Sequence, residues 1–201
     1  MIDRTNLDFS AARMPQSELE ALRAENEALR LRVSALEDQL RFLSNHKTLA
    51  AGLAGESLIS GLVSGVLTAH TASVDVLLKD GRSIEVKHAK LSYSSPIKAP
   101  TSARWQWGKI FGEKNRKSFD LLVLVAEADP KYRDGYRDEG SPYVLFLLTA
   151  EQAEAVTTAH TAGAKGILLG TNPHSKKPKA RMFFDDFQLT AQELSDQIGH
   201  I

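Results

Sequence analysis

The chain has 201 residues, of which 42% are hydrophobic and 25% are charged, enough for one globular domain with an accessory element. Its 25 basic residues balance its 25 acidic residues, so a polyanionic partner such as nucleic acid would have to bind a local basic patch. The chain has no cysteine, which excludes disulfide frameworks, thiolate zinc sites and cysteine nucleophiles.

Residues 1–16 are expected to form an N-terminal tail. Their sequence lacks the basic segment, the apolar segment and the small-residue cleavage site of a secretory signal. No apolar run in the chain approaches the ~20 residues that a membrane-spanning helix needs. We therefore expect a soluble, cytoplasmic protein without membrane contact.

Residues 17–46 are predicted to form a coiled-coil dimerisation helix. Apolar side chains recur at positions a and d of a seven-residue repeat, and one a position holds asparagine. Such a narrow apolar stripe is typical of a two-stranded parallel coil rather than of a helix packed on its own domain. The predicted dimer contacts are Leu19, Leu22, Asn26, Leu29, Val33, Leu36, Leu40 and Leu43.

The charged residues that flank the stripe support this interpretation. In a parallel pair, a residue at position g faces the residue at position e of the partner, five positions on. A buried Asn26 would pair with its own copy, which lowers stability but specifies register, dimer number and parallel orientation. All three charged g–e pairs are attractive: Glu18 with Arg23, Glu25 with Arg30, and Arg32 with Glu37.

Residues 47–201 are expected to form one domain that begins with a helix, at residues 46–69. Two strands follow, SVDVLLK and RSIEVKHAKL, and the pair Asp80-Gly81 predicts a type I′ turn between them. We place the next segment, RWQWGKIFGEKNRK (residues 104–117), on a helix.

The remaining elements alternate strands and helices. The runs FDLLVLVAEA and YVLFLL predict strands, GILLG is a short apolar run, and MFFDDF is a candidate strand. Thr149 with Gln152 and Thr190 with Glu193 have capping-box spacing, which predicts that a helix begins at each threonine. The order predicts an α/β or α+β domain, a mixed sheet flanked by helices.

Three charged residues interrupt the apolar hairpin strands. Glu85 and Lys87 share one face because side chains alternate along a strand, and Asp75 can point to that face from the other strand. Two converging carboxylates, with a backbone carbonyl and water, suit Mg²⁺ or Mn²⁺, which prefer oxygen ligands. A lysine two residues from such a ligand can orient or help deprotonate a water, or stabilise charge on a phosphate oxygen.

The pattern Asp75, nine intervening residues, then Glu85-Val86-Lys87 resembles the PD-(D/E)xK nuclease superfamily, which includes restriction endonucleases, Holliday junction resolvases and repair nucleases. Val74 stands where the motif has proline. Members commonly carry a further acid on the preceding helix, where this chain has Glu56. The resemblance spans roughly residues 50–148 and implies a restriction-endonuclease-like fold, with a metal held by Glu56, Asp75 and Glu85 and a hydrolytic water assisted by Lys87.

Two basic patches are the expected DNA contacts, because cations bind phosphates. The first patch includes Trp105 and Trp107, which can stack on bases, although core packing is the preferred interpretation. The second is the loop around residues 171–181, for which a merely solvated loop is an equal alternative. The candidate contacts are Lys98, Arg104, Lys109, Lys114, Arg116 and Lys117 in the first patch, and Lys176, Lys177, Lys179 and Arg181 in the second.

These features predict a Mg²⁺-dependent homodimeric DNA endonuclease of type II restriction type, in which Mn²⁺ can substitute and each copy cuts one strand of a symmetric site. The pairing of dimers into tetramers stays open. One alternative is a Holliday junction resolvase or repair nuclease of the same superfamily. Another is a non-catalytic coiled-coil adaptor that binds nucleic acid or protein, since an Asp, Glu and Lys set across a hairpin is often just a solvated face.

Overall fold

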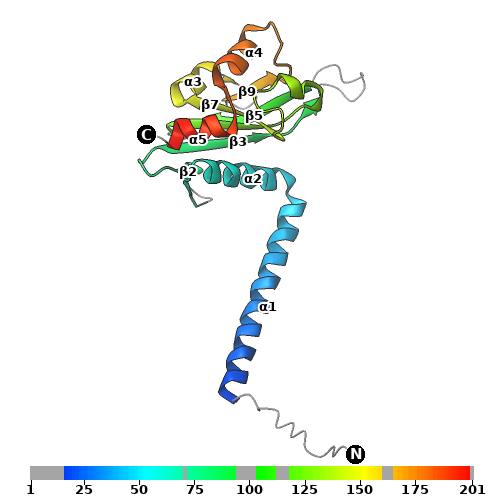
Figure 1. The fold of residues 1–201 in the computed structure, drawn as a ribbon, viewed down its shortest axis with the longest axis vertical. Coiled ribbons are helices and arrows are strands. Elements are labelled where there is room, and N and C mark those ends of the chain that lie inside the picture. The colour runs from blue at the N-terminus through cyan, green and yellow to red at the C-terminus, as the bar shows by residue number, and fades with distance from the viewer. Residues whose placement is uncertain (1–15, 70–71, 94–102, 112–117, 160–164, 200–201) are drawn as a thin grey trace, which may run out of the picture. The chain divides into compact units, whose positions relative to one another are not determined.

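The computed structural model describes residues 16–69, 72–93, 103–111, 118–159 and 165–199. The chain divides into two compact units, Met1–Lys47 and Thr48–Ile201, which are described one at a time. Figure 1 shows the helix of the first unit in blue and the strands of the second mainly in green and yellow.

The first unit contains one described helix, α1 (Gln16–Asn45), which runs for 30 residues without a break. Its leucines are largely exposed, with Leu22 at 48% and Leu29 at 53%, whereas Leu19 is half-buried. The prediction of a long N-terminal helix with exposed leucines is confirmed. The side chain of Leu43 lies outside the described set. No helix in the described ranges combines the length and the apolar character needed to cross a membrane.

The second unit is built on a mixed six-stranded sheet in the order β1-β2-β3-β6-β7-β10. The central strands β3 and β6 are parallel, and every other neighbouring pair is antiparallel. The predicted mixed sheet is therefore confirmed. The strands are β1 (Val66–Leu67), β2 (Val76–Leu77), β3 (Ser83–Ala89), β6 (Leu121–Glu127), β7 (Tyr143–Thr149) and β10 (Gln188–Leu189).

A second, antiparallel sheet covers one face of the first. Its four strands lie in the order β4 (Ser92–Tyr93), β5 (Ala103–Phe111), β9 (Lys165–Gly170), β8 (Thr158–Ala159). Trp105 and Trp107 are fully buried in the cluster between the sheets, and their indole N–H groups donate to the carbonyls of Glu127 and Val125 at 2.8 and 3.3 Å. The prediction that the tryptophans pack in the core is confirmed.

The helix predicted over residues 104–117 is wrong where the structure describes this segment. Residues 103–111 form β5, and residues 112–117 lie outside the described ranges. Trp105 and Trp107 are buried while Gln106 between them is exposed, which is the two-residue alternation of a strand. Both indoles pack between the two sheets, so residues 105 and 107 must point to the same face of the strand.

Helices cover the other face of the six-stranded sheet. Residues of α2 (Lys47–Leu62) and α5 (Ala191–Gly199) form one apolar cluster with Ile84 and Val86 of β3. Figure 1 shows α2 running beside β2 and β3. The expected helix over residues 46–69 therefore exists but ends at Leu62, before β1.

The two predicted capping boxes are present. The Gln152 N–H donates to Thr149 Oγ1 at 3.2 Å and the Thr149 N–H donates to Gln152 Oε1 at 2.8 Å, where α3 (Ala150–Val156) begins. Thr190 and Glu193 exchange the equivalent bonds, at 3.1 and 2.8 Å, where α5 begins. Both helix starts therefore follow from local sequence alone.

The candidate strand MFFDDF is helical instead. The short helix α4 (Pro178–Met182) continues into a π-helical turn, η2 (Phe183–Phe187), before β10. Phe183, Phe184 and Phe187 are all buried. Their spacing of one, three and four residues places them on one side of a helical turn, whereas a strand would point neighbouring phenylalanines to opposite faces.

The hairpin between β2 and β3 closes with a three-residue loop, so the predicted type I′ turn is wrong. Gly81 has φ +90°, whereas Asp80 is not among the described residues with positive φ, as type I′ would require. The Leu78 N–H donates to the Arg82 carbonyl at 2.9 Å, and the Gly81 N–H donates to the Leu78 carbonyl at 3.1 Å. This is a type I turn followed by a left-handed glycine.

Asp120 ties the start of β6 to the start of β3 and makes stability depend on pH. The Ser83 N–H and hydroxyl donate to Asp120 Oδ2 at 2.7 and 2.8 Å, and these bonds lower the pKa of the carboxyl. The stabilisation is present above the unfolded pKa of about 3.9 and is lost as the pH falls through the lower folded pKa. We expect the unfolding free energy of the wild type to fall more than that of Asp120→Asn between pH 5 and 3 in urea titrations. Parallel pH dependences of the two proteins would contradict this assignment.

Candidate active site

Asp75 lies directly beside Glu85 at the end of the β2–β3 ladder. The Asp75 N–H donates to the Ile84 carbonyl at 3.0 Å, and the Val86 N–H donates to Asp75 Oδ2 at 2.7 Å. These two bonds bracket Glu85 on the neighbouring strand. The predicted juxtaposition of Asp75 and Glu85 is therefore present in the backbone arrangement.

The Asp75 carboxylate replaces a backbone acceptor. In the register set by Val76 and Ile84, a regular ladder would pair the Val86 N–H with the Val74 carbonyl. That carbonyl instead accepts a hydrogen bond from the Thr68 hydroxyl. The Asp75 carboxylate thus accepts the hydrogen bond of a Val86 N–H group that has no backbone acceptor on the neighbouring strand. This is a structural role, independent of any catalytic role of Asp75.

Glu85 and Lys87 form a buried ion pair. Lys87 Nζ lies 2.5 Å from Glu85 Oε1, and the Glu85 side chain is 0% exposed while that of Lys87 is 23% exposed. Their partners on β6 are Leu122 and Leu124, which belong to the cluster under the second sheet. Glu85 and Lys87 therefore point toward that sheet, on the shared face that the alternation predicted.

Glu56 is on α2, which packs against the opposite face of β3. A Cβ at Gly55 would lie 3.3 Å from His88 Cβ and 3.7 Å from Val86 Cγ1, so α2 approaches β3 closely at this point. The His88 side chain is partly buried by this packing; its burial lowers its pKa, and the nearby charge of Glu127 partly opposes the shift. Over the part of the chain that the structure describes, no group of three His, Cys, Asp or Glu side chains could hold a metal ion. The structure therefore does not assemble Glu56, Asp75 and Glu85 into one centre.

The chemistry of Asp75 and Glu85 nevertheless fits Mg²⁺. Mg²⁺ sites in phosphoryl-transfer enzymes commonly use one or two carboxylates, with waters and substrate phosphates as the other ligands. Asp75 Oδ2 is held by a backbone N–H, as ligating carboxylates usually are. The carboxylates of Asp75 and Glu85, which come from neighbouring strands, are therefore of the ligand type that suits Mg²⁺ without a third protein ligand.

The first basic patch is only partly within the described residues. Lys98, Lys114, Arg116 and Lys117 lie outside them. Arg104 is half-buried on β5, and its Nε is buried without a hydrogen-bond partner in the described ranges. Lys109 is exposed at an irregularity of β5, with φ 53°. Lys109 is the described residue of this patch best placed to bind a phosphate.

The second basic patch differs from residue to residue. Lys176 and Lys177 are exposed, and Lys177 lines a cavity of about 250 Å³ with Tyr132, Asn172 and Ser175. Lys179 is half-buried, its Nζ donates to the Val156 carbonyl at 3.3 Å, and burial lowers its pKa. Lys179 therefore holds the loop to the end of α3 rather than facing solvent.

A buried polar cluster that no sequence pattern indicated lies beside this cavity. Asp129 and Thr171 are 5% and 1% exposed, and the Thr171 hydroxyl donates to Asp129 Oδ2 at 2.7 Å. The Tyr136 hydroxyl donates to the Thr171 carbonyl at 2.8 Å. Asp129 precedes a proline in a turn-rich stretch, a pattern that predicts an exposed turn rather than a buried carboxylate.

Neither protein-family models nor curated proteins give a match to this chain. The assignment of function therefore depends on the arrangement of the residues themselves.

Proposed function

We propose that the globular unit is a Mg²⁺-dependent DNA endonuclease, related in design to PD-(D/E)xK nucleases. The observation that carries this proposal is the pair of hydrogen bonds by which Asp75 brackets Glu85, with Lys87 paired to Glu85. An acid on one strand and a Glu-x-Lys on the next, in a mixed sheet with a preceding helix, is the arrangement that the resemblance implies.

Each residue has a distinct proposed role. Asp75 and Glu85 would hold Mg²⁺, and Lys87 would leave Glu85 and place its ammonium beside the attacked phosphate. Bound Mg²⁺ would polarise the phosphate and make water a better nucleophile. The water oxygen would form a bond to phosphorus and pass its proton to solvent, while one ester P–O bond breaks and the leaving oxygen takes up a proton from solvent. The ammonium of Lys87 stabilises the charge that develops on the phosphate oxygens.

The substrate is proposed to be DNA bound through the basic residues. Lys109, Lys176 and Lys177 are exposed and can contact phosphates without a change in the fold. Lys179 and Arg104 are half-buried and are expected to contribute less. A duplex with a symmetric site is the preferred substrate, and a four-way junction or a damaged duplex is the alternative within the superfamily.

A non-catalytic adaptor is the second candidate. The observation that favours it is that each residue of the set already has a structural partner: Asp75 accepts from Val86, and Lys87 neutralises Glu85. In this alternative the acids serve the fold, and the basic residues bind nucleic acid or protein without hydrolysis.

The proposal is tested by incubating the full chain with plasmid DNA, phage DNA and a four-way junction, in Mg²⁺, in Mn²⁺ and in EDTA. Discrete fragments that require the metal support the nuclease, and the substrate that is cut separates the restriction type from the resolvase type. Asp80→Asn is a matched control, because Asp80 is an exposed acid of the same hairpin and should cleave like the wild type. If no substrate is cut and calorimetry detects no Mg²⁺ binding, the adaptor is the better description.

A further inference from the structure

Helix α1 presents a row of apolar side chains that no other described residue of its own unit covers. Leu22, Leu29, Val33, Leu36 and Leu40 are all between 48% and 67% exposed. Together with Asn26 they recur at alternate spacings of four and three residues, so they form one stripe along the 30-residue helix. A long helix with a continuous exposed stripe needs a partner helix to bury it.

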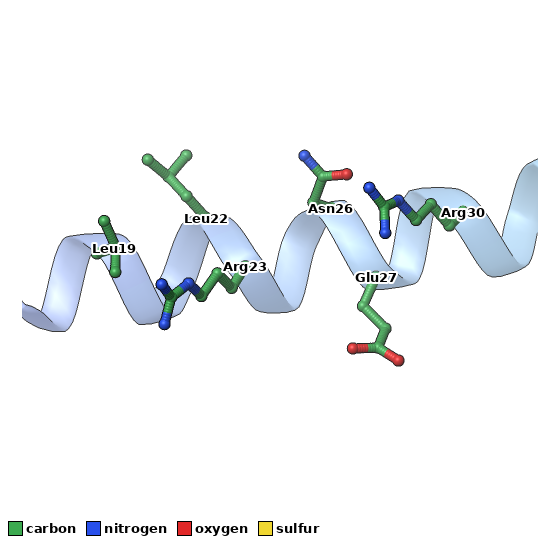
Figure 2. Close-up of a pocket in the computed structure, with 6 residues that line it drawn as sticks. All are labelled: Leu19, Leu22, Arg23, Asn26, Glu27 and Arg30. Carbon is green, nitrogen blue, oxygen red and sulfur yellow. The ribbon is translucent and has the colours of Figure 1, made fainter.

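The stripe also contains a site for a side chain of such a partner. A groove on the helix is lined by Leu19, Leu22, Arg23 and Asn26, together with Glu27 and Arg30. Figure 2 shows the Leu22 and Asn26 side chains projecting from the same side of the helix. Leu19, Leu22, Arg23 and Asn26 occupy positions a, d, e and the next a of the repeat. In a parallel coiled coil, these four positions form the hole that receives the d-position side chain of the partner helix.

We propose that the partner of α1 is a second copy of this chain, parallel and in register, with Leu22 of each copy seated in the groove of the other. The inference does not rest on the nuclease chemistry, because it uses only residues of α1. It assigns the interaction surface of the first unit and the chemical nature of its partner.

Asn26 and the charges select the parallel arrangement. In a parallel pair Asn26 meets its own copy, so each side-chain amide has a donor and an acceptor to pair with. In a fully overlapped antiparallel pair, position a faces position d, and Asn26 would lie against Leu36 with its amide unsatisfied. The parallel pair also places Glu25 beside Arg30, whereas the antiparallel pair brings two copies of Arg30 together near the centre.

Leu29 and Leu31 provide a matched test of the surface. Both are exposed leucines, 53% and 68%, but Leu29 lies in the stripe and Leu31 lies at position f on the other side. Light scattering of the full chain should give twice the 22.1 kDa chain mass for the wild type and for Leu31→Asp. Leu29→Asp should give the mass of a single chain. A monomeric wild type, or equal behaviour of the two variants, would overturn the proposal.

Orientation is tested by disulfide formation, since the chain has no cysteine of its own. Under oxidising conditions, Leu22→Cys should form a covalent dimer, whereas Ala24→Cys, at position f, should not. In a mixture of Leu22→Cys and Leu40→Cys, each variant should cross-link only to itself. Mixed cross-links between the two variants would show antiparallel pairing and overturn the parallel register.

Discussion

Replacing Lys87 with methionine is expected to lower the free energy of unfolding by about 3 kcal/mol, because it removes the cation paired with a fully buried carboxylate. Methionine retains the unbranched apolar stem of lysine, so the loss of packing is small. The destabilisation therefore comes mainly from the loss of the ion pair between Lys87 and the buried carboxylate of Glu85. Urea unfolding of the full chain, followed by circular dichroism at pH 7, measures this difference.

The double variant Lys87→Met with Glu85→Gln should recover most of this stability, since neither side chain then carries a charge in the interior. The matched control is Lys79→Met, an exposed lysine on the same hairpin, which should change the unfolding free energy by less than about 0.5 kcal/mol. The assignment of a buried ion pair is wrong if Lys87→Met is no more destabilising than Lys79→Met. All variants that alter Glu85 or Lys87 should lack nuclease activity under the proposed mechanism. The double variant is therefore expected to be nearly as stable as the wild type but unable to cleave DNA.

The elements that the sequence predicted correctly are those whose signals are local. Examples are the apolar run of β6, the capping boxes of Thr149 with Gln152 and of Thr190 with Glu193, and the heptads of α1. Each of these signals involves residues within a single strand or within one or two helical turns. The segment from Arg104 to Phe111 was misassigned because its partner strand β9 lies some sixty residues further along the chain. Its two tryptophans show the two-residue alternation of a strand, which the helix prediction did not take into account.

The sequence predicts that Glu85 and Lys87 share one face of a strand, but it does not predict which elements pack around them. Alternation along β3 was enough to place Glu85 and Lys87 on one face. The two-residue turn predicted at Asp80-Gly81 would have paired Asp75 with Val86, and it is the three-residue loop that sets Asp75 beside Glu85. The burial of Glu85 depends on the second sheet, which consists of β4, β5, β9 and β8, and no local sequence pattern predicts that these strands pair. The position of Glu56 depends on which face of β3 packs against α2, and the close approach of Gly55 to Val86 and His88 identifies that face only in the structure.

Replacing Asp75 with asparagine is expected to separate the two roles of this residue. The asparagine carbonyl can still accept the hydrogen bond from the Val86 N–H, so the unfolding free energy should stay within about 1 kcal/mol of the wild type. The amide carries no charge and is a poor Mg²⁺ ligand, so cleavage in Mg²⁺ should fall by on the order of 100-fold or more. Asp75→Ala should lose both, because the Val86 N–H would have no acceptor, at a cost of roughly 1–3 kcal/mol.

Cleavage rates on the substrate cut by the wild type, together with urea unfolding of each variant, decide between the two candidate functions. A stable Asp75→Asn that has lost Mg²⁺ binding assigns the carboxylate charge to catalysis, since the hydrogen bond alone accounts for the fold. If Asp75→Asn cleaves and binds Mg²⁺ like the wild type, the carboxylate serves only as a backbone acceptor and the proposed metal site is wrong. Asp80→Asn makes the same chemical change at an exposed position of the hairpin, so any loss shared by both variants would reflect the hairpin rather than the site.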